Sequence, residues 1–206
     1  MNIYIPMSLP FYYLENIPFE LCEWRNSISQ FDKQQSIIDK GAKHISETTR
    51  NFFVTRGILP SFGILWSWPK NQNPSMTYHT DADIDKNGIV YVTDYCSINF
   101  LLDGDGGITE FISIDKATEI GKIFNSDKVN LRYRLFENIE PEYKAYLTYN
   151  NPIMMRTDVP HRVNTNDITK TRWTYSLRFN IKKNNKLEKV RIENLVSSLH
   201  DNICYK

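Results

Sequence analysis

The chain has 206 residues, of which 41% are hydrophobic and 13% aromatic. A chain of this length can bury one substantial core, so we expect a single domain over residues 1–206. The 25 basic and 24 acidic residues leave a formal charge of +1. This balance provides no overall attraction for a polyanion or an anionic membrane, so composition indicates neither a nucleic-acid nor a membrane partner.

The cysteines and the N-terminus suggest a reducing compartment. Cys22, Cys96 and Cys204 form no Cys-x-x-Cys pair, so neither a disulfide framework nor a zinc knuckle is indicated. Prolines interrupt the apolar N-terminus, and no apolar run is long enough to cross a membrane. We therefore expect a soluble, cytoplasmic protein.

The first quarter of the chain has helical periodicity. Between Pro18 and Arg56 apolar residues recur at spacings of about three to four, which predicts two or three amphipathic helices with a break near Gly41. We expect them to form an outer helical layer over residues 1–60. After Pro60 the pattern changes to β-prone apolar runs separated by Asn, Asp, Gly and Pro. These runs predict strands at 61–68, 89–102, 108–114, 144–149, 152–157 and 172–181.

Two further helices are expected. Apolar residues of segment 115–125 fall on one helical face, so we interpret it as a helical insertion between strands. The spacing of Ile192, Leu195 and Leu199 predicts a C-terminal helix over 186–204. Short strands without a helix after each one favour an antiparallel sandwich or barrel, so the predicted fold is mainly β with flanking helices.

One short string suggests a metal site. His79 and Asp81 are separated by one residue, so on an extended segment both project to the same face and can hold one cation. His161 is the candidate third ligand, although it could instead be a turn histidine bonded to the backbone. Two histidines and one carboxylate leave adjacent coordination positions open, which is the arrangement of non-haem Fe(II) oxygenases.

Two arginines follow on one predicted strand. Arg172 and Arg178 are spaced evenly and therefore face the same way. An arginine inside a barrel is costly unless it meets an anion, and its planar fork matches a carboxylate.

These residues resemble the Fe(II)- and 2-oxoglutarate-dependent oxygenase family. His79-Thr-Asp81, His161 and Arg172 follow the order of its ligand and cosubstrate motifs. The likeness is closest to the prolyl-4-hydroxylase-like branch and covers residues 61–181. It extends to the strings DGDGGITEF at 103–111, YNNPIMMRTDVPHRV at 149–163 and TRWTYSLRF at 171–179. Segment 113–143 is longer than expected, and residues 1–60 match no part of the family.

The resemblance implies a double-stranded β-helix (jelly-roll) core at 61–181. It also implies that His79, Asp81 and His161 hold Fe(II) and that Arg172 binds the distal carboxylate of 2-oxoglutarate, with Arg178 as the rival. The implied activity is that of a dioxygenase, a hydroxylase that uses O₂ and 2-oxoglutarate and releases succinate and CO₂. Its substrate would be a peptide or a small molecule.

Polar and aromatic residues near these motifs have two interpretations each. Tyr91, Tyr95, Ser97 and Asn99 share one face of a predicted strand, which either joins the cosubstrate pocket or faces solvent. The aromatic residues around the first motif either form a substrate wall or belong to the core. They are Trp66, Trp68 and Tyr78.

Residues 83–94 support a competing hypothesis. Asp83, Asp85, Asn87, Gly88 and Asp94 occupy liganding or turn positions of an EF-hand loop, which would make the chain a calcium-binding module. The β-prone sequence after the loop instead favours a type I′ hairpin turn at Asn87-Gly88. A further alternative is a metal-binding jelly-roll without turnover. Residues 103–107 are interpreted as a tight turn.

Overall fold

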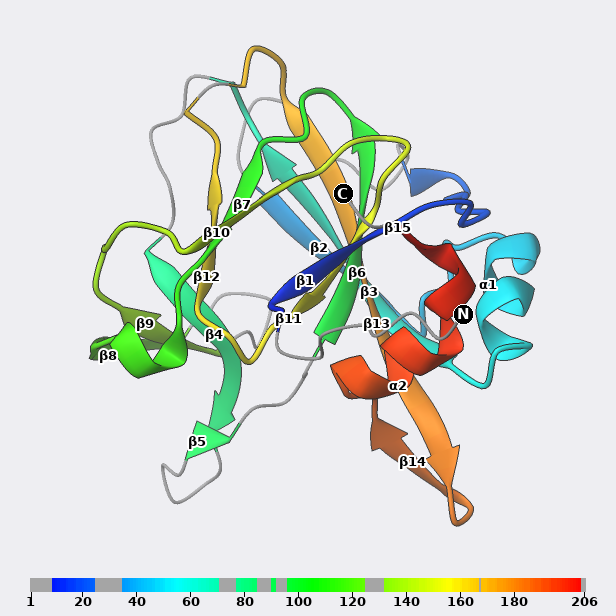
Figure 1. The fold of residues 1–206 in the computed structure, drawn as a ribbon. Coiled ribbons are helices and arrows are strands. Elements are labelled where there is room, and N and C mark those ends of the chain that lie inside the picture. The colour runs from blue at the N-terminus through cyan, green and yellow to red at the C-terminus, as the bar shows by residue number, and fades with distance from the viewer. Residues whose placement is uncertain are drawn as a thin grey trace.

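The computed structural model describes residues 9–24, 35–70, 77–84, 90–91, 96–124, 132–166 and 168–204. Within these residues the fold is mainly β, with two antiparallel sheets and the helices α1 (Glu47–Val54) and α2 (Ile192–Ser198). Figure 1 shows the smaller sheet on the left, the larger sheet in the middle and both helices on the right. Neither helix is long and apolar enough to span a membrane.

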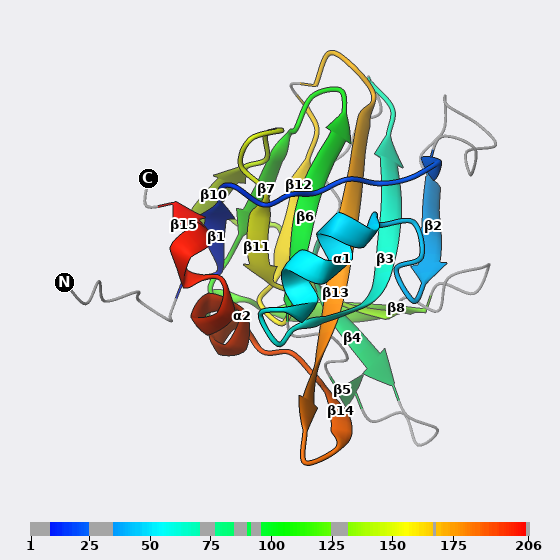
Figure 2. The ribbon, with the colours of Figure 1, turned by 90° about the vertical axis from the view of Figure 1, so that its right-hand side faces the viewer.

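The larger sheet has eight strands in the order β15-β1-β11-β6-β13-β3-β2, with β14 paired to β13. Figure 2 shows α1 and α2 lying across its outer face. The apolar core between this face and the helices includes Leu14, Phe53, Ile98 and Leu195. The strands are β1 (Phe11–Leu14), β2 (Gln35–Lys40), β3 (Leu59–Trp68), β6 (Cys96–Asp103), β11 (Ile153–Arg156), β13 (Arg172–Lys183), β14 (Lys186–Lys189) and β15 (Ile203–Cys204).

The smaller sheet has seven strands in the order β10-β7-β12-β4-β9-β8, with β5 paired to β4. An apolar cluster around Phe111, Leu147 and Ile153 fills part of the space between the two sheets, and a polar pocket occupies another part. The strands are β4 (Tyr78–Ile84), β5 (Val90–Tyr91), β7 (Ile108–Phe111), β8 (Glu119–Phe124), β9 (Arg132–Phe136), β10 (Tyr143–Tyr146) and β12 (His161–Asn164).

Strand β13 lies between β6 and β3 and divides apolar from polar residues by simple alternation. Trp173, Tyr175 and Leu177 point into the core beneath the helices, since successive side chains of a strand face opposite ways. The residues between and beside them line the pocket between the sheets. They are Arg172, Thr174, Ser176 and Arg178. The even spacing of the two arginines therefore places both in one pocket, as predicted.

A buried hydrogen-bond network ties edge strand β2 to β13 across β3. The hydroxyl of Tyr175 donates to Asp39 Oδ2 over 2.7 Å, and burial raises the pKa of this tyrosine. Asp39 also accepts the backbone N–H groups of Lys43 and His44 at 2.8 and 2.9 Å. The tyrosine side chain passes over Gly63 of β3, where a Cβ would lie 1.9 Å from its hydroxyl oxygen. Only glycine leaves room for this link.

The prediction of an N-terminal helical layer is wrong apart from α1. Residues 35–40 form strand β2, which pairs with β3 along its length, and residues 11–14 form β1. Adjacent β-branched residues such as Ile37 and Ile38 suit a strand, and the neighbouring edge of β3 provides the backbone partners. The chain turns at Gly41, which has a φ of 76°. The helix α1 begins after Ser46, whose hydroxyl accepts the Thr49 N–H.

The predicted helical insertion at 115–125 is also wrong. It is a short 3₁₀ turn at Ile114–Lys116 followed by β8, which pairs antiparallel with β9. The C-terminal helix is confirmed but shorter than the predicted 186–204 range. Residues 186–189 form β14 in a hairpin with β13, and β15 follows the 3₁₀ turn at His200–Asn202. In each case a partner strand that lies outside the local pattern decides the structure.

We predict that Gly63→Ala destabilises the protein. The new methyl group would force Tyr175 away from Asp39, and overpacking of a core costs about 1–3 kcal/mol of unfolding free energy. Urea denaturation followed by circular dichroism measures this change. Gly121→Ala is the matched control, because a Cβ on this strand glycine meets nothing within 4 Å. Equal effects of the two substitutions would contradict the proposed packing.

Candidate metal centre

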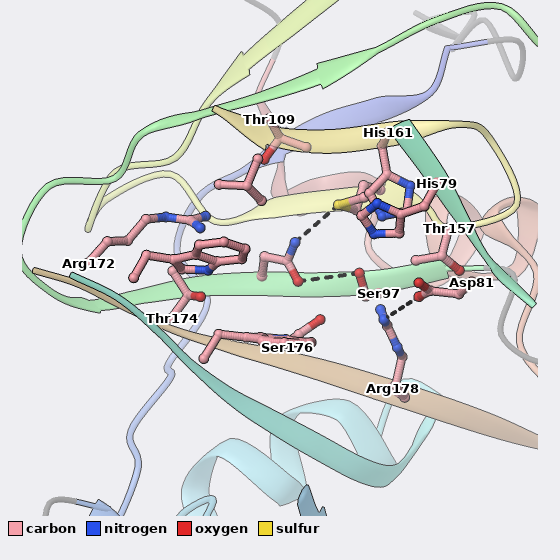
Figure 3. A pocket seen from close by; sticks show the side chains of 15 residues that line it. His79, Asp81, Ser97, Thr109, Thr157, His161, Arg172, Thr174, Ser176 and Arg178 are labelled. Atoms are coloured by element: carbon pink, nitrogen blue, oxygen red, sulfur yellow. Dashed lines mark hydrogen bonds and ion pairs between the residues drawn. The ribbon is translucent and has the colours of Figure 1, made fainter. Parts of the chain in front are cut away.

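Two neighbouring strands of the smaller sheet bring three potential ligands together. His161 on β12 lies directly opposite His79 on β4, and the centroids of their rings are 4.6 Å apart. Asp81 lies two residues beyond His79 on the same face. The ligand atoms of the three side chains lie within 4.8 Å of one another, and all three residues are buried. Figure 3 shows them converging on one end of the pocket. This cluster can bind a metal ion.

Backbone carbonyl groups orient both imidazole rings. His79 Nδ1 lies 3.1 Å from the Thr77 carbonyl oxygen, and His161 Nδ1 lies 2.9 Å from that of Val159. A carbonyl oxygen only accepts hydrogen bonds, so each Nδ1 carries the proton and each Nε2 keeps its lone pair. Metal-binding histidines are commonly oriented in this way.

The surroundings of both histidines favour the neutral form of the imidazole. Burial lowers the pKa of His79, and the nearby Arg178 guanidinium adds to this effect. The pKa of His161 lies well below its usual value because of burial, with further lowering by His79 and Arg178. Neutral imidazole is the form that binds metals.

An ion pair holds the carboxylate of Asp81. Arg178 Nη2 donates to Asp81 Oδ2 over 2.6 Å, and both side chains are largely buried. The backbone N–H of Asp81 donates to the Thr157 carbonyl over 2.9 Å. With Oδ2 engaged, Oδ1 is the oxygen available to an ion. Arg178 therefore acts on the ligand cluster itself.

Arg172 has a different environment at the opposite end of the pocket (Figure 3). It is only 2% exposed. Its Nε lacks a hydrogen-bond partner, and no hydrogen bond or ion pair with any residue of the described ranges reaches its guanidinium. Burial without a counter-charge lowers its pKa to about 9. A buried cation of this kind needs an anion, so this end of the pocket is suited to a carboxylate.

A turn between β6 and β7 holds the chain just before Arg172. The Asp105 carboxylate accepts the N–H and hydroxyl of Thr169 and the N–H of Lys170. At Gly104, where φ is +80°, a Cβ would lie 1.8 Å from the Thr171 carbonyl oxygen. Residues 104–107 form a short connection between β6 and β7 with a bend at Gly104, and these contacts hold the start of β13 in place.

The remaining pocket wall combines predicted and unpredicted residues. Ser97 and Asn99 line it from β6, which agrees with the interpretation that their polar face joins the pocket. The side chains of Tyr91 and Tyr95 lie outside the described residues. Trp66 and Trp68 also line the pocket, with ring centroids 6.4 Å apart. By contrast Tyr78 belongs to a small apolar core.

Six further lining residues were not singled out from the sequence, Thr109, Met155, Thr157, Val163, Thr174 and Ser176. Alternation with neighbours already assigned could have revealed Thr174 and Ser176 on β13 and Val163, which lies two residues after His161 on β12. The other three depend on which strands face the pocket, and this information is not local.

The region of the EF-hand hypothesis begins with strand rather than helix. Residues 78–84 form β4, and β5 pairs antiparallel with it. The EF-hand requires a helix before its loop. Strand β4 occupies that position, so the described residues favour a hairpin. Ile84 pairs with Val90, whereas a two-residue turn at Asn87-Gly88 would pair Ile84 with Tyr91. The predicted turn at Asn87-Gly88 itself lies outside the described residues, so it stays a prediction.

No protein-family model and no curated protein matches the sequence.

We predict that the chain binds one Fe(II) ion under anaerobic conditions and that His79→Ala, Asp81→Ala and His161→Ala each abolish binding. Loss of a ligand should cost more than the roughly 10- to 100-fold typical of an outer-shell partner. Metal titration with equilibrium dialysis measures the affinity. His200→Ala is the control, since His200 is exposed and lies away from the cluster. Unchanged Fe(II) affinity in the three variants would contradict the assignment.

Proposed function

We propose that the protein is an Fe(II)- and 2-oxoglutarate-dependent dioxygenase with a jelly-roll core. The observation that carries the proposal is one pocket with two complementary ends. One end holds the His79-Asp81-His161 cluster, and the other holds the buried guanidinium of Arg172, which has no partner among the described residues. A ligand that joins a metal-chelating group to a carboxylate fits both ends, and 2-oxoglutarate has this form.

The donor set supports iron as the metal. Two neutral imidazoles and one carboxylate suit Fe(II), and none of the pocket-lining residues is a cysteine. When bound, iron together with 2-oxoglutarate and O₂ supplies the oxidation of a C–H bond, with release of succinate and CO₂. His79, Asp81 and His161 would hold the ion.

The other pocket residues bind and orient. Arg172 would pair with the distal carboxylate of the cosubstrate through its planar fork. Arg178 holds Asp81 in place, so the role of cosubstrate partner goes to Arg172 rather than to its rival. Ser97 and Asn99 offer a hydroxyl and an amide along the wall between the two ends. Most of the residues that line the pocket are buried.

The proposed reaction is a hydroxylation of a peptidyl or small-molecule substrate. Loops that select substrates vary independently of the metal site. The proposed substrate class therefore comes from the family resemblance and not from the metal site. Succinate formation separates the proposed enzyme from a metal-binding jelly-roll without turnover.

We predict that Arg172→Ala weakens 2-oxoglutarate by about 2–5 kcal/mol, or roughly 30- to 4,000-fold in Kd, because it removes one partner of a buried charge pair. Iron should still bind. Arg172→Lys should have a smaller effect, since it keeps the charge but loses the fork. Isothermal titration of the iron-loaded variants with 2-oxoglutarate gives these affinities.

A ligand without the distal carboxylate completes this test. Wild-type protein should bind 2-oxobutyrate far more weakly than 2-oxoglutarate, whereas Arg172→Ala should bind the two with similar affinity. Lys170→Ala, at an exposed position near the same strand end, serves as the control. If Arg178→Ala rather than Arg172→Ala abolished the preference, the carboxylate role would belong to Arg178.

A further inference from the structure

Two adjacent methionines on β11 have opposite surroundings. Met154 is fully buried in the core between the larger sheet and the helices. Met155 is 2% exposed but lines the pocket that contains the ligand cluster. They therefore form a matched pair with the same chemistry and the same protection from bulk solvent, and only one of them faces the candidate metal centre.

The thioether of Met155 is held by a polar neighbour. Asn99 Nδ2 donates to Met155 Sδ over 3.0 Å, and Figure 3 draws this contact as a dashed line ending on the sulfur. A thioether is a weak acceptor, so within the described residues the only hydrogen bond that this amide N–H group donates is a weak one. The contact fixes the sulfur at the pocket wall.

The backbone places Met155 near the ligand end of the pocket. Two residues after it, the Thr157 carbonyl accepts the N–H of Asp81. The two pocket tryptophans occupy the other end, since Trp68 pairs with Arg172 and Trp66 with Thr174. The Cα atoms of Arg172 and Arg178 lie about 20 Å apart along β13. Arg178 is the one that holds Asp81. Among the readily oxidised side chains of the pocket, Met155 is therefore the one on a segment that contacts a metal ligand.

We propose that Met155 is a self-oxidation site, at which the protein modifies itself when it consumes 2-oxoglutarate with no substrate in the pocket. This inference rests on the proposed function. One oxygen atom of O₂ forms a bond to Sδ, and the thioether loses two electrons to become a sulfoxide. The other oxygen atom enters the carboxylate of succinate, as 2-oxoglutarate loses two electrons and releases CO₂. No proton is gained or lost by the sulfur.

The modification has a structural consequence for the pocket. A sulfoxide oxygen is a stronger acceptor than a thioether, so the Asn99 amide stabilises the oxidised form. The added oxygen also makes this wall larger and more polar beside the ligand cluster. Self-oxidation therefore limits the activity of enzyme that turns over without substrate.

The test is peptide mass spectrometry after incubation with Fe(II), 2-oxoglutarate and O₂ without substrate. Catalase is added to remove free peroxide. Trypsin releases residues 145–156 as one peptide containing both methionines, and fragment ions assign the added oxygen to one of them. We expect it on Met155 and not on Met154. Heavy-isotope O₂ should label the sulfoxide, and omission of 2-oxoglutarate or the His161→Ala substitution should prevent its formation.

The possible outcomes separate this inference from the proposed function. Consumption of 2-oxoglutarate with Met155 intact overturns the inference and leaves the oxygenase proposal standing. Oxidation of both methionines alike, or oxidation that does not need 2-oxoglutarate, also overturns it. If 2-oxoglutarate is not consumed at all, the proposed function fails and this inference fails with it. Met155→Leu provides a second measurement, since iron-loaded variant should lose activity more slowly than wild type during incubation without substrate.

Discussion

The burial of two arginines on one central strand is the constraint on which the rest of the structure depends. Strand β13 is covered on one face by an apolar core and on the other by the smaller sheet, so Arg172 and Arg178 cannot both reach bulk water. Arg178 is compensated by Asp81. Arg172 has no such partner within the described residues. The cost of burying that charge is acceptable if an anionic ligand is part of the working state.

The same strand connects the fold to the metal centre. Its outward residues anchor it to the helices, and the contact between Tyr175 and Asp39 over Gly63 ties it to the sheet edge. On its pocket-facing side, Arg178 contacts the ligand cluster at one end, and Arg172 lies at the other end. A small shift of β13 would therefore change the distance between the two ends of the pocket.

The sequence predicted the parts of the structure that depend on local alternation. Strand β13 has a long pattern of period two, and His79 and Asp81 share a face for the same reason. The N-terminal helices failed because the spacing around Ile37 and Ile38 fits a helix as well as an edge strand, and only pairing with β3 decides between them. The helix expected at 115–125 failed similarly, since β9 lies outside that pattern. The ion pair between Arg178 and Asp81 could not be predicted, because it depends on the distance between two residues that are far apart in the sequence.

The central claim is that one small molecule spans the pocket from the metal ion to Arg172. Fe(II) chelated by a 2-oxo acid absorbs visible light through charge transfer, so anaerobic titration of iron-loaded protein with 2-oxoglutarate, followed by visible absorption, tests this claim most directly. The account predicts a new band for the wild type, the same band at higher 2-oxoglutarate concentrations for Arg172→Ala, and none for His161→Ala. Absence of the band in the wild type, or identical titration curves for wild type and Arg172→Ala, would contradict it.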